Sequence, residues 1–194
     1  MKQPEPGKRP TPQLFTDTPL ALGLKALFLK LEQELALGRS LPVFLAGGMA
    51  VHLYTGTRVT TDVDAEFAGR IIFPRDLSVI VTLEDGSPQV VFLDTNYNST
   101  FALLHEDYQS DAIPVDLGLQ FLQVFVLSPL DLIVSKLSRF ADNDRDDIGQ
   151  LVQLGLASAE QIEARVNDAL VGYIGNPALL LCNLRDVIAM AQRE

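Results

Sequence analysis

The sequence contains few of the residues that several classes of protein require. Its 194 residues include one cysteine, Cys182, two histidines and no tryptophan. A single cysteine cannot form an internal disulfide, and two histidines offer little material for a zinc site or a Ser-His-Asp site. We expect His52 to be a partly buried, hydrogen-bonded residue. We expect Cys182, which lies among leucines, to be a buried and unreactive thiol.

Long apolar runs are also absent. No stretch approaches the ~18 uninterrupted apolar residues that a membrane-spanning helix needs. The opening segment, MKQPEPGKRPTPQ, lacks the apolar core of a secretion signal. We therefore expect a cytoplasmic protein that has no membrane partner. With 47% hydrophobic and 21% charged residues, the composition is that of a globular protein, and the length suits one domain.

Basic residues are scarce and unevenly placed. The chain has 15 Lys and Arg against 25 Asp and Glu, for a formal net charge of -10, and no Lys or Arg occurs from residue 76 through 131. A protein that coats nucleic acid by charge attraction needs a basic surface, so we expect no extended nucleic-acid surface. A nucleotide is not excluded, because a few carboxylates that hold metal ions can recruit phosphate to an acidic protein.

The pattern of apolar residues predicts an α+β protein. Four prolines in residues 1–18 predict a flexible arm. A core at 19–127 follows, with a helix at 20–37, a buried strand at 41–46, a short helix at 49–54, and strands at 62–67, 77–83, 89–93, 100–104, 112–117 and 123–126. We expect 77–83 to pair with 89–93 as a hairpin, and 100–104 with 112–117. A helical C-terminal portion at 128–194 has predicted helices at 129–140, 145–154, 159–173 and 177–192.

Three features of the core suggest a chemical site. Gly47-Gly48 lies between a strand and a helix, where glycines let phosphate approach the backbone amides of a helix N-terminus. Asp62 and Asp64 are two residues apart on a predicted strand and so project from one face. Such a pair repels itself unless a cation is present, and oxygen ligands suit Mg²⁺. If Asp116 lies on a neighbouring strand, three carboxylates converge, although each acid could also be an ordinary surface charge.

These features together resemble a known family. The Gly47-Gly48 pair, the run Arg58-Val59-Thr60-Thr61-Asp62-Val63-Asp64 and the run Val115-Asp116-Leu117 are similar to the motifs of the nucleotidyltransferase superfamily related to DNA polymerase β. Within it, residues 128–137 and 144–148 resemble a second conserved block of the bacterial abortive-infection and type IV toxin group. The resemblance implies a minimal nucleotidyltransferase core, a mixed sheet flanked by helices, followed by a helical portion.

The resemblance also implies roles for particular residues. Asp62, Asp64 and Asp116 would be catalytic and would ligate Mg²⁺ or Mn²⁺. Four residues of the first motifs would contact the nucleotide, namely Gly47, Gly48, Arg58 and Thr60. Lys136, in the second conserved block, would contact it as well. Asp144 and Asp147 match later acidic positions of the group, whereas Asn143 stands where relatives tend to have a basic residue. From the residues alone, Arg58 could equally be a loop charge, and Lys136 could be an exposed residue on its helix.

The implied activity is transfer of a nucleoside monophosphate from an NTP to a hydroxyl, with release of pyrophosphate. The resemblance points to the toxin of a toxin–antitoxin or phage-defence pair, with a tRNA end or a protein side chain as acceptor and a cognate antitoxin as a possible partner. Two alternatives stay open. One is a non-catalytic nucleotide-binding or partner-binding module on the same fold. The other is a small-molecule nucleotidyltransferase of the antibiotic-modifying kind, whose acidic cleft would suit a cationic drug.

Overall fold

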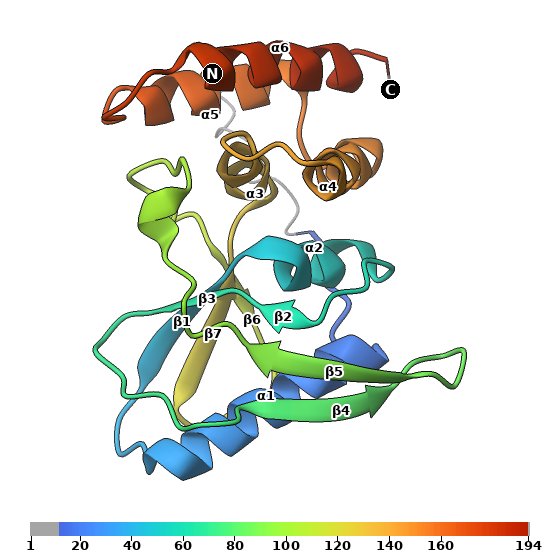
Figure 1. Ribbon diagram of the computed structural model, residues 1–194, viewed down its shortest axis with the longest axis vertical. Coiled ribbons are helices and arrows are strands. Elements are labelled where there is room, and N and C mark those ends of the chain that lie inside the picture. Colours follow the sequence, from blue (N-terminus) through green and yellow to red (C-terminus); the bar gives the residue numbers. More distant parts are fainter. Residues whose placement is uncertain (1–11, 194) are drawn as a thin grey trace, which may run out of the picture.

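The computed structural model describes residues 12–193, which form an α+β protein with two mixed sheets and six helices (Figure 1). The strands are β1 (Leu41–Leu45), β2 (Asp62–Val63), β3 (Ala65–Phe67), β4 (Ser78–Thr82), β5 (Pro88–Leu93), β6 (Ile113–Val115) and β7 (Leu122–Val126). The helices are α1 (Pro19–Leu35), α2 (Gly47–Thr55), α3 (Pro129–Lys136), α4 (Asp142–Gln153), α5 (Ala159–Leu170) and α6 (Ala178–Ala191). The predicted fold class is therefore confirmed.

The strands form one sheet of four and one of three. The order in the larger sheet is β3-β1-β7-β6, and in the smaller sheet it is β2-β5-β4. Helix α1 contacts β4 and β5, and α3 to α6 gather at the opposite end of the molecule, beyond α2 (Figure 1). Glu32 of α1 fixes the start of β7, because its buried carboxylate accepts hydrogen bonds of 2.6 Å from the backbone amides of Phe121 and Leu122. None of the helices in residues 12–193 is long and apolar enough to cross a membrane.

The predicted helices form close to their expected bounds. Helix α1 begins after Thr18, whose hydroxyl accepts a hydrogen bond of 3.2 Å from the backbone amide of Ala21. It ends where Ala36 takes a left-handed conformation with φ of 46°. Its buried side chains recur at helical spacing, so burial of one face selects the helix, as the sequence pattern indicates.

The end of the predicted N-terminal arm is held by the core. The backbone amide of Phe15 donates a hydrogen bond of 2.8 Å to the carbonyl of Leu53 in α2. The hydroxyl of Thr18 lies 2.6 Å from Nε2 of His52. Residues 1–11, which carry most of the predicted arm, lie outside the described residues. The prediction of an arm up to residue 18 is therefore too long.

The predicted strand at 62–67 divides into two strands that belong to different sheets. β2 pairs in parallel with β5, with Asp62 opposite Phe92, whereas β3 pairs antiparallel with β1. Asp64 lies between them, and its carbonyl accepts a hydrogen bond of 2.9 Å from the amide of Ala46. The segment is extended, as its alternation of polar and apolar residues predicts, but its two halves pair with strands of different sheets. The division places Asp64 at the junction of the sheets.

The predicted pairing of 100–104 with 112–117 is wrong. Residues Ser99–Phe101 form a short 3₁₀ helix, and the segment after it has no strand. β6 pairs antiparallel with β7 instead, with Val115 opposite Val124. The apolar residues of the segment misled the prediction because Leu103 is buried as part of a loop. Burial of a loop side chain needs no strand pairing.

A buried ion pair joins two helices of the helical portion, and one of its residues also contacts the core. Arg165 of α5 donates hydrogen bonds of 2.9 and 2.8 Å to the carboxylate of Asp131 in α3. The same guanidinium lies 2.8 Å from Asp111, in the loop before β6. Because Asp131 is fully buried, this two-bond pairing fixes how α5 packs on α3.

The prediction that Cys182 is buried is wrong, since the thiol is exposed. The buried side chains of α6 are Leu180, Asn183, Leu184 and Val187. This spacing defines one face of the helix, and residue 182 falls outside it. The neighbouring leucines in the sequence therefore do not surround the cysteine in space.

Candidate active site

A polar pocket of about 410 Å³ lies where β1, β2 and β5 end, with residues of α3 and α4 on its other side. Asp62, Asp64 and Asp94 line one wall. Charged groups of both signs line the opposite wall, namely Arg58, Lys136, Arg139, Asp144 and Asp147. Another hollow, of about 570 Å³ beside Leu41 and Ile72, has no carboxylate in its lining and so offers no comparable chemistry.

The three acids of the first wall are brought together by the parallel pairing of β2 and β5. In that register Val63 is opposite Leu93, so Asp64 and Asp94 are the next residues along each strand. The amide of Asp94 donates a hydrogen bond of 3.1 Å to the carbonyl of Val63, which continues the pairing. Carboxyl ends of parallel strands meet at one edge of a sheet, and the acids meet there.

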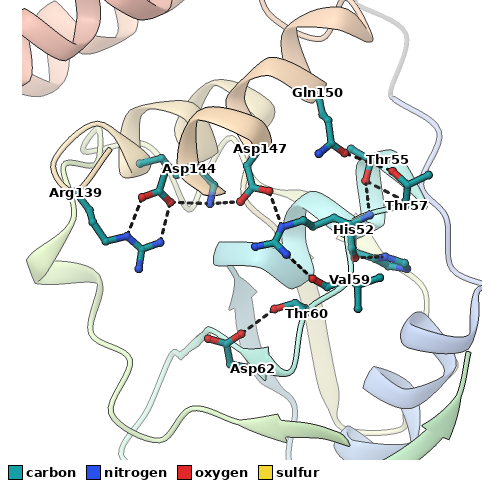
Figure 2. Close-up of polar contacts among 12 residues, drawn as sticks. His52, Thr55, Thr57, Val59, Thr60, Asp62, Arg139, Asp144, Asp147 and Gln150 are labelled. Atoms are coloured by element: carbon teal, nitrogen blue, oxygen red, sulfur yellow. Dashed lines mark hydrogen bonds and ion pairs between the residues drawn. The ribbon is translucent and has the colours of Figure 1, made fainter. Parts of the chain in front are cut away.

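The carboxylates in this wall repel one another. Burial, together with the negative charges of Asp62 and Asp94, raises the pKa of Asp64 from 3.8 to about 6, although Lys136 and Arg139 act in the opposite direction. Thr60 relieves part of the crowding, because its hydroxyl donates a hydrogen bond of 2.7 Å to the carboxylate of Asp62 (Figure 2). This wall therefore carries an excess of negative charge on half-buried side chains.

The glycine pair makes room for these side chains. Gly47 begins α2 with φ of +59°, and a Cβ added there would lie 1.8 Å from Oδ2 of Asp64. A Cβ on Gly48 would lie 2.8 Å from the hydroxyl of Thr60. Both positions line the pocket. A side chain at position 47 would therefore displace Asp64, and one at position 48 would displace Thr60, which supports Asp62.

The opposite wall is a network of ion pairs around two buried acids of α4, with cations from α3, the segment after it and the loop after α2. Asp147 of α4 accepts from Nζ of Lys136 at 2.8 Å and from Nε of Arg58 at 2.6 Å (Figure 2). Asp144, one helical turn earlier, lies 3.4 Å from the same lysine and accepts two hydrogen bonds from Arg139 at 2.7 and 2.8 Å. The two acids thereby hold all three cations beside the pocket, the exposed Arg139 less firmly than Lys136 and Arg58.

Burial alone would raise the pKa of Asp144, but the hydrogen bonds from Arg139 and the charge of Lys136 outweigh it and lower the pKa. Asp147 is fully buried, and the side chain of Lys136 is only 7% exposed. The guanidinium of Arg139 is largely exposed, at 69%. The position of Lys136 on its helix would also permit an exposed side chain, but the side chain is buried. Arg139 is the most accessible of the three cations.

His52 supports the loop that carries Arg58. Its Nδ1 donates a hydrogen bond of 2.8 Å to the carbonyl of Arg58, which leaves Nε2 to accept from the hydroxyl of Thr18. Burial lowers the pKa of His52, although the bond to the Arg58 carbonyl acts against this, so the neutral ring is favoured. The expectation of a buried, hydrogen-bonded histidine is confirmed.

Asp116 does not join the other acids. It is exposed, follows β6 and accepts a hydrogen bond of 2.9 Å from the amide of Gly118. β6 runs antiparallel to β7, so residue 116 lies toward the end of the sheet where β7 begins, whereas the pocket lies near the end of β1, which runs parallel to β7. The expected convergence of Asp62, Asp64 and Asp116 is thus incorrect.

Asp94 takes the place that Asp116 was expected to occupy. Its signal in the sequence is an acid directly after the apolar end of a strand, Val91-Phe92-Leu93-Asp94. The same signal precedes Asp116, and only the pairing of the strands separates the two. The loop after β5 contributes further pocket residues that the sequence analysis did not single out, namely Asn96, Tyr97 and Asn98.

Whether these residues suit a metal ion depends on what else supplies ligands. Among residues 12–193, no group of three or more His, Cys, Asp and Glu side chains is arranged to hold a metal ion by itself. Mg²⁺ commonly keeps several waters and is held by one or two carboxylates together with substrate phosphates. The oxygen donors of Asp62 and Asp64, and the mutual repulsion that raises the pKa of Asp64, fit an ion of that kind. The fit is to a cation that shares its ligands with a phosphate.

Comparison with known proteins places the chain in a family. Residues 24–176 match the model of a family described as nucleotidyltransferase of unknown function (DUF6036). No curated protein and no solved structure gives a match. The match covers both sheets, the pocket and most of the helical portion, and supports the resemblance to nucleotidyltransferases without singling out its toxin group. The chain belongs to the DUF6036 family of nucleotidyltransferases.

Proposed function

We propose that the protein is a Mg²⁺- or Mn²⁺-dependent nucleotidyltransferase that moves a nucleoside monophosphate from an NTP to a hydroxyl. One observation carries the proposal. Three crowded acids at the ends of two parallel strands face three cations across one pocket, in a chain whose family is that of nucleotidyltransferases. A triphosphate with its divalent cations has charges of both signs and so matches both walls.

The acidic wall would hold the metal. Asp62 and Asp64 would be its ligands, and Asp94, which lies beside Asp64 in the strand register, completes the wall. When bound, the ion would supply charge neutralisation for the triphosphate and a lower pKa for the acceptor hydroxyl. Gly47 leaves the space in which the Asp64 carboxylate lies against the start of α2.

The cationic wall would hold the phosphates. Lys136 and Arg58 are positioned by Asp147, so they present fixed donors without reorganisation when the nucleotide enters. Arg139 is exposed enough to move toward a phosphate while its bidentate partner, Asp144, stays in place. The acceptor oxygen would bond to the α-phosphorus as the bond to the β-phosphate oxygen breaks, with pyrophosphate leaving and the hydroxyl proton passing to a carboxylate of the acidic wall.

The biological role is a further part of the proposal. The segments at 128–137 and 144–148, which resemble the toxin group, contain the lysine and both buried acids of the ion-pair network. This supports a toxin of a toxin–antitoxin or phage-defence system, which a cognate antitoxin would neutralise. Induced expression should arrest bacterial growth, and Asp64→Asn should grow normally at equal protein level. Equal arrest by both would contradict a role for transfer in toxicity.

The test of the activity is transfer of label from α-³²P-labelled NTPs in the presence of Mg²⁺ or Mn²⁺. Purified protein is incubated with total RNA, with a lysate protein pool or with a mixture of small hydroxylated compounds, and each fraction is counted. Asp62→Asn and Asp64→Asn should lose transfer by at least ~10³-fold, as expected for groups that act on the transition state. Asp116→Asn, outside the pocket, is the matched control and should retain it.

The same experiment separates a binding module from an enzyme. Calorimetry with NTP and Mg²⁺ that gives binding, together with no transfer to any acceptor fraction, would replace the proposal with a non-catalytic module. Loss of transfer in Asp116→Asn that equals the loss in Asp64→Asn would contradict the assignment of the pocket as the reaction site.

A further inference from the structure

The smaller sheet has one apolar face that no element of residues 12–193 covers. Along β4 and β5 the side chains alternate: Val79, Val81 and Val91 face α1 and the core, and Ile80, Val90 and Phe92 face solvent. Ile80 is 74% exposed, Val90 46% and Phe92 39%. The register places Ile80 directly opposite Val90. In Figure 1 the helix α1 passes behind these strands. Ser78, Thr82 and Pro88 are also exposed on this face, so Ile80, Val90 and Phe92 form its apolar part. An exposed apolar cluster is a candidate interaction site.

This apolar face is continuous with the pocket. Phe92 is paired with Asp62 in the parallel register of β5 and β2, and residues opposite each other in a ladder project from the same side of the sheet. Neighbouring strands are ~4.8 Å apart, so the apolar face and the acidic wall share an edge. A second hollow, of about 610 Å³, lies beside Phe92 and Val90 and extends to Thr95, the residue after Asp94. A molecule that rests on this face therefore lies beside Asp62, the first acid of the wall.

Charge restricts what this molecule can be. No Lys or Arg occurs from residue 76 through 135, a span that includes β4, β5 and the loop along the pocket. The span contains acids throughout, namely Asp76, Glu84, Asp85, Asp94, Glu106, Asp107, Asp111, Asp116 and Asp131. Arg75 is the one cation in the lining of the hollow beside Phe92. A nucleic acid needs several phosphate contacts from cations, whereas an uncharged polypeptide segment with apolar side chains needs none.

We propose that the exposed face of β4 and β5 docks a polypeptide acceptor and directs one of its hydroxyl side chains into the pocket. The inference rests on the proposed function and names its substrate class. Apolar side chains of the acceptor cover Ile80, Val90 and Phe92, and the hollow beside Phe92 accepts one of them. A Ser, Thr or Tyr oxygen then bonds to the α-phosphorus of the NTP. The α–β bridging bond breaks, pyrophosphate leaves and the hydroxyl proton passes to a carboxylate of the acidic wall.

Two substitutions at one exposed position separate a polypeptide from an RNA acceptor. Ile80→Asp and Ile80→Lys both remove the apolar surface, but only the lysine would favour phosphate. Ile72→Asp is the matched control, because Ile72 is also an exposed isoleucine, at 93%, and belongs to a different hollow, beside Leu41. Each full-length protein is incubated with α-³²P-NTP, Mn²⁺, and either nuclease-treated lysate protein or deproteinised total RNA. Calorimetry with NTP and Mn²⁺ confirms that nucleotide binding is unchanged.

The expected result is label in the protein pool for wild type and for Ile72→Asp. Both Ile80 variants should fall by about tenfold or more, the effect of losing one buried apolar anchor at an interface. Label in RNA that rises for Ile80→Lys and falls for Ile80→Asp overturns the inference and leaves the proposed function intact. Protein labelling by the Ile80 variants at the level of Ile72→Asp also overturns it. Absence of transfer to any acceptor, with wild type binding NTP, overturns both proposals together.

Discussion

Replacing Asp64 by asparagine should stabilise the protein while it abolishes transfer. The acid is held in a place that disfavours its charge, because burial and the charges of Asp62 and Asp94 raise its pKa from 3.8 to about 6. One pKa unit is worth ~1.4 kcal/mol of differential interaction, so the charged form costs the folded protein up to ~3 kcal/mol above pH 6. Solvent around the partly exposed carboxylate screens part of this, and we expect a gain of ~1–3 kcal/mol in unfolding free energy.

The pH dependence gives the sign of the effect. A carboxyl whose pKa is higher in the folded than in the unfolded protein binds more protons when folded, in the window between 3.8 and about 6. Its stabilising protonation is complete below that window and is lost as the pH rises through it. The difference between Asp64→Asn and wild type should therefore be small at pH 4 and reach its full value above pH 6.

Urea denaturation at pH 4, 5, 6 and 8, without divalent cations, measures this difference. Asp116→Asn is the control, because Asp116 is exposed and outside the pocket, and its effect should stay within ~0.5 kcal/mol at every pH. A variant Asp64→Asn that is no more stable than wild type at pH 8 would refute the reasoning, as would a gain that does not change with pH. Either result would mean that the acids are not crowded.

Three further predictions concern the supports of the pocket. Gly47→Ala should lower the unfolding free energy in urea by ~1–3 kcal/mol, since φ of +59° disfavours a side chain and the added Cβ meets a carboxylate; an unchanged midpoint would contradict this. Asp147→Asn should cost ~3–5 kcal/mol, because it leaves Lys136 buried with one weak partner at 3.4 Å. The exposed neighbour Asp146, changed to Asn, should cost under ~0.5 kcal/mol. For His52, whose pKa burial lowers below 6.5, the unfolded protein takes up the proton first, so stability falls as the pH drops below 6.5. His52→Gln should flatten that slope in the difference between the two denaturation curves, and a slope equal to that of wild type would exclude His52 as its source.

Local sequence patterns were sufficient to predict the helices and the hairpin of β4 and β5, but not how the other strands pair. A helix such as α1 buries one face, and the residues of that face recur at helical spacing along the sequence. The leucines of residues 20–35 therefore indicate the helix without knowledge of what it packs against. A strand outside a hairpin is defined by neighbours that lie far away in the sequence. The run at 62–67 changes partners at Asp64, and no local pattern marks that change. Leu103 shows the opposite error, an apolar residue buried without a strand.

The candidate site was predictable to the same extent. Asp62 and Asp64 could be paired from their spacing, and Lys136 from its resemblance to a conserved block. The third acid could not be chosen, because Asp94 and Asp116 each follow the apolar end of a strand. β5 runs parallel to β2 and brings Asp94 beside Asp64. β6 runs antiparallel to β7, so its last residues, and Asp116 after them, lie at the end of the sheet away from the pocket. Strand direction, which the sequence does not encode locally, makes the selection.

The charges around the pocket determine what an acidic protein would need in order to bind the proposed nucleotide. Five carboxylates and three cations line it, a formal excess of two negative charges before any ligand binds. A bare triphosphate would add to that excess and be repelled, so the walls alone do not favour an NTP. The cations are already paired with Asp144 and Asp147, which lowers their attraction for phosphate further. Divalent cations are the one addition that neutralises both the acidic wall and the triphosphate. Under the proposed function, nucleotide binding should therefore require them, and the same charges that disfavour long nucleic acid should favour a nucleotide that carries its metal ions.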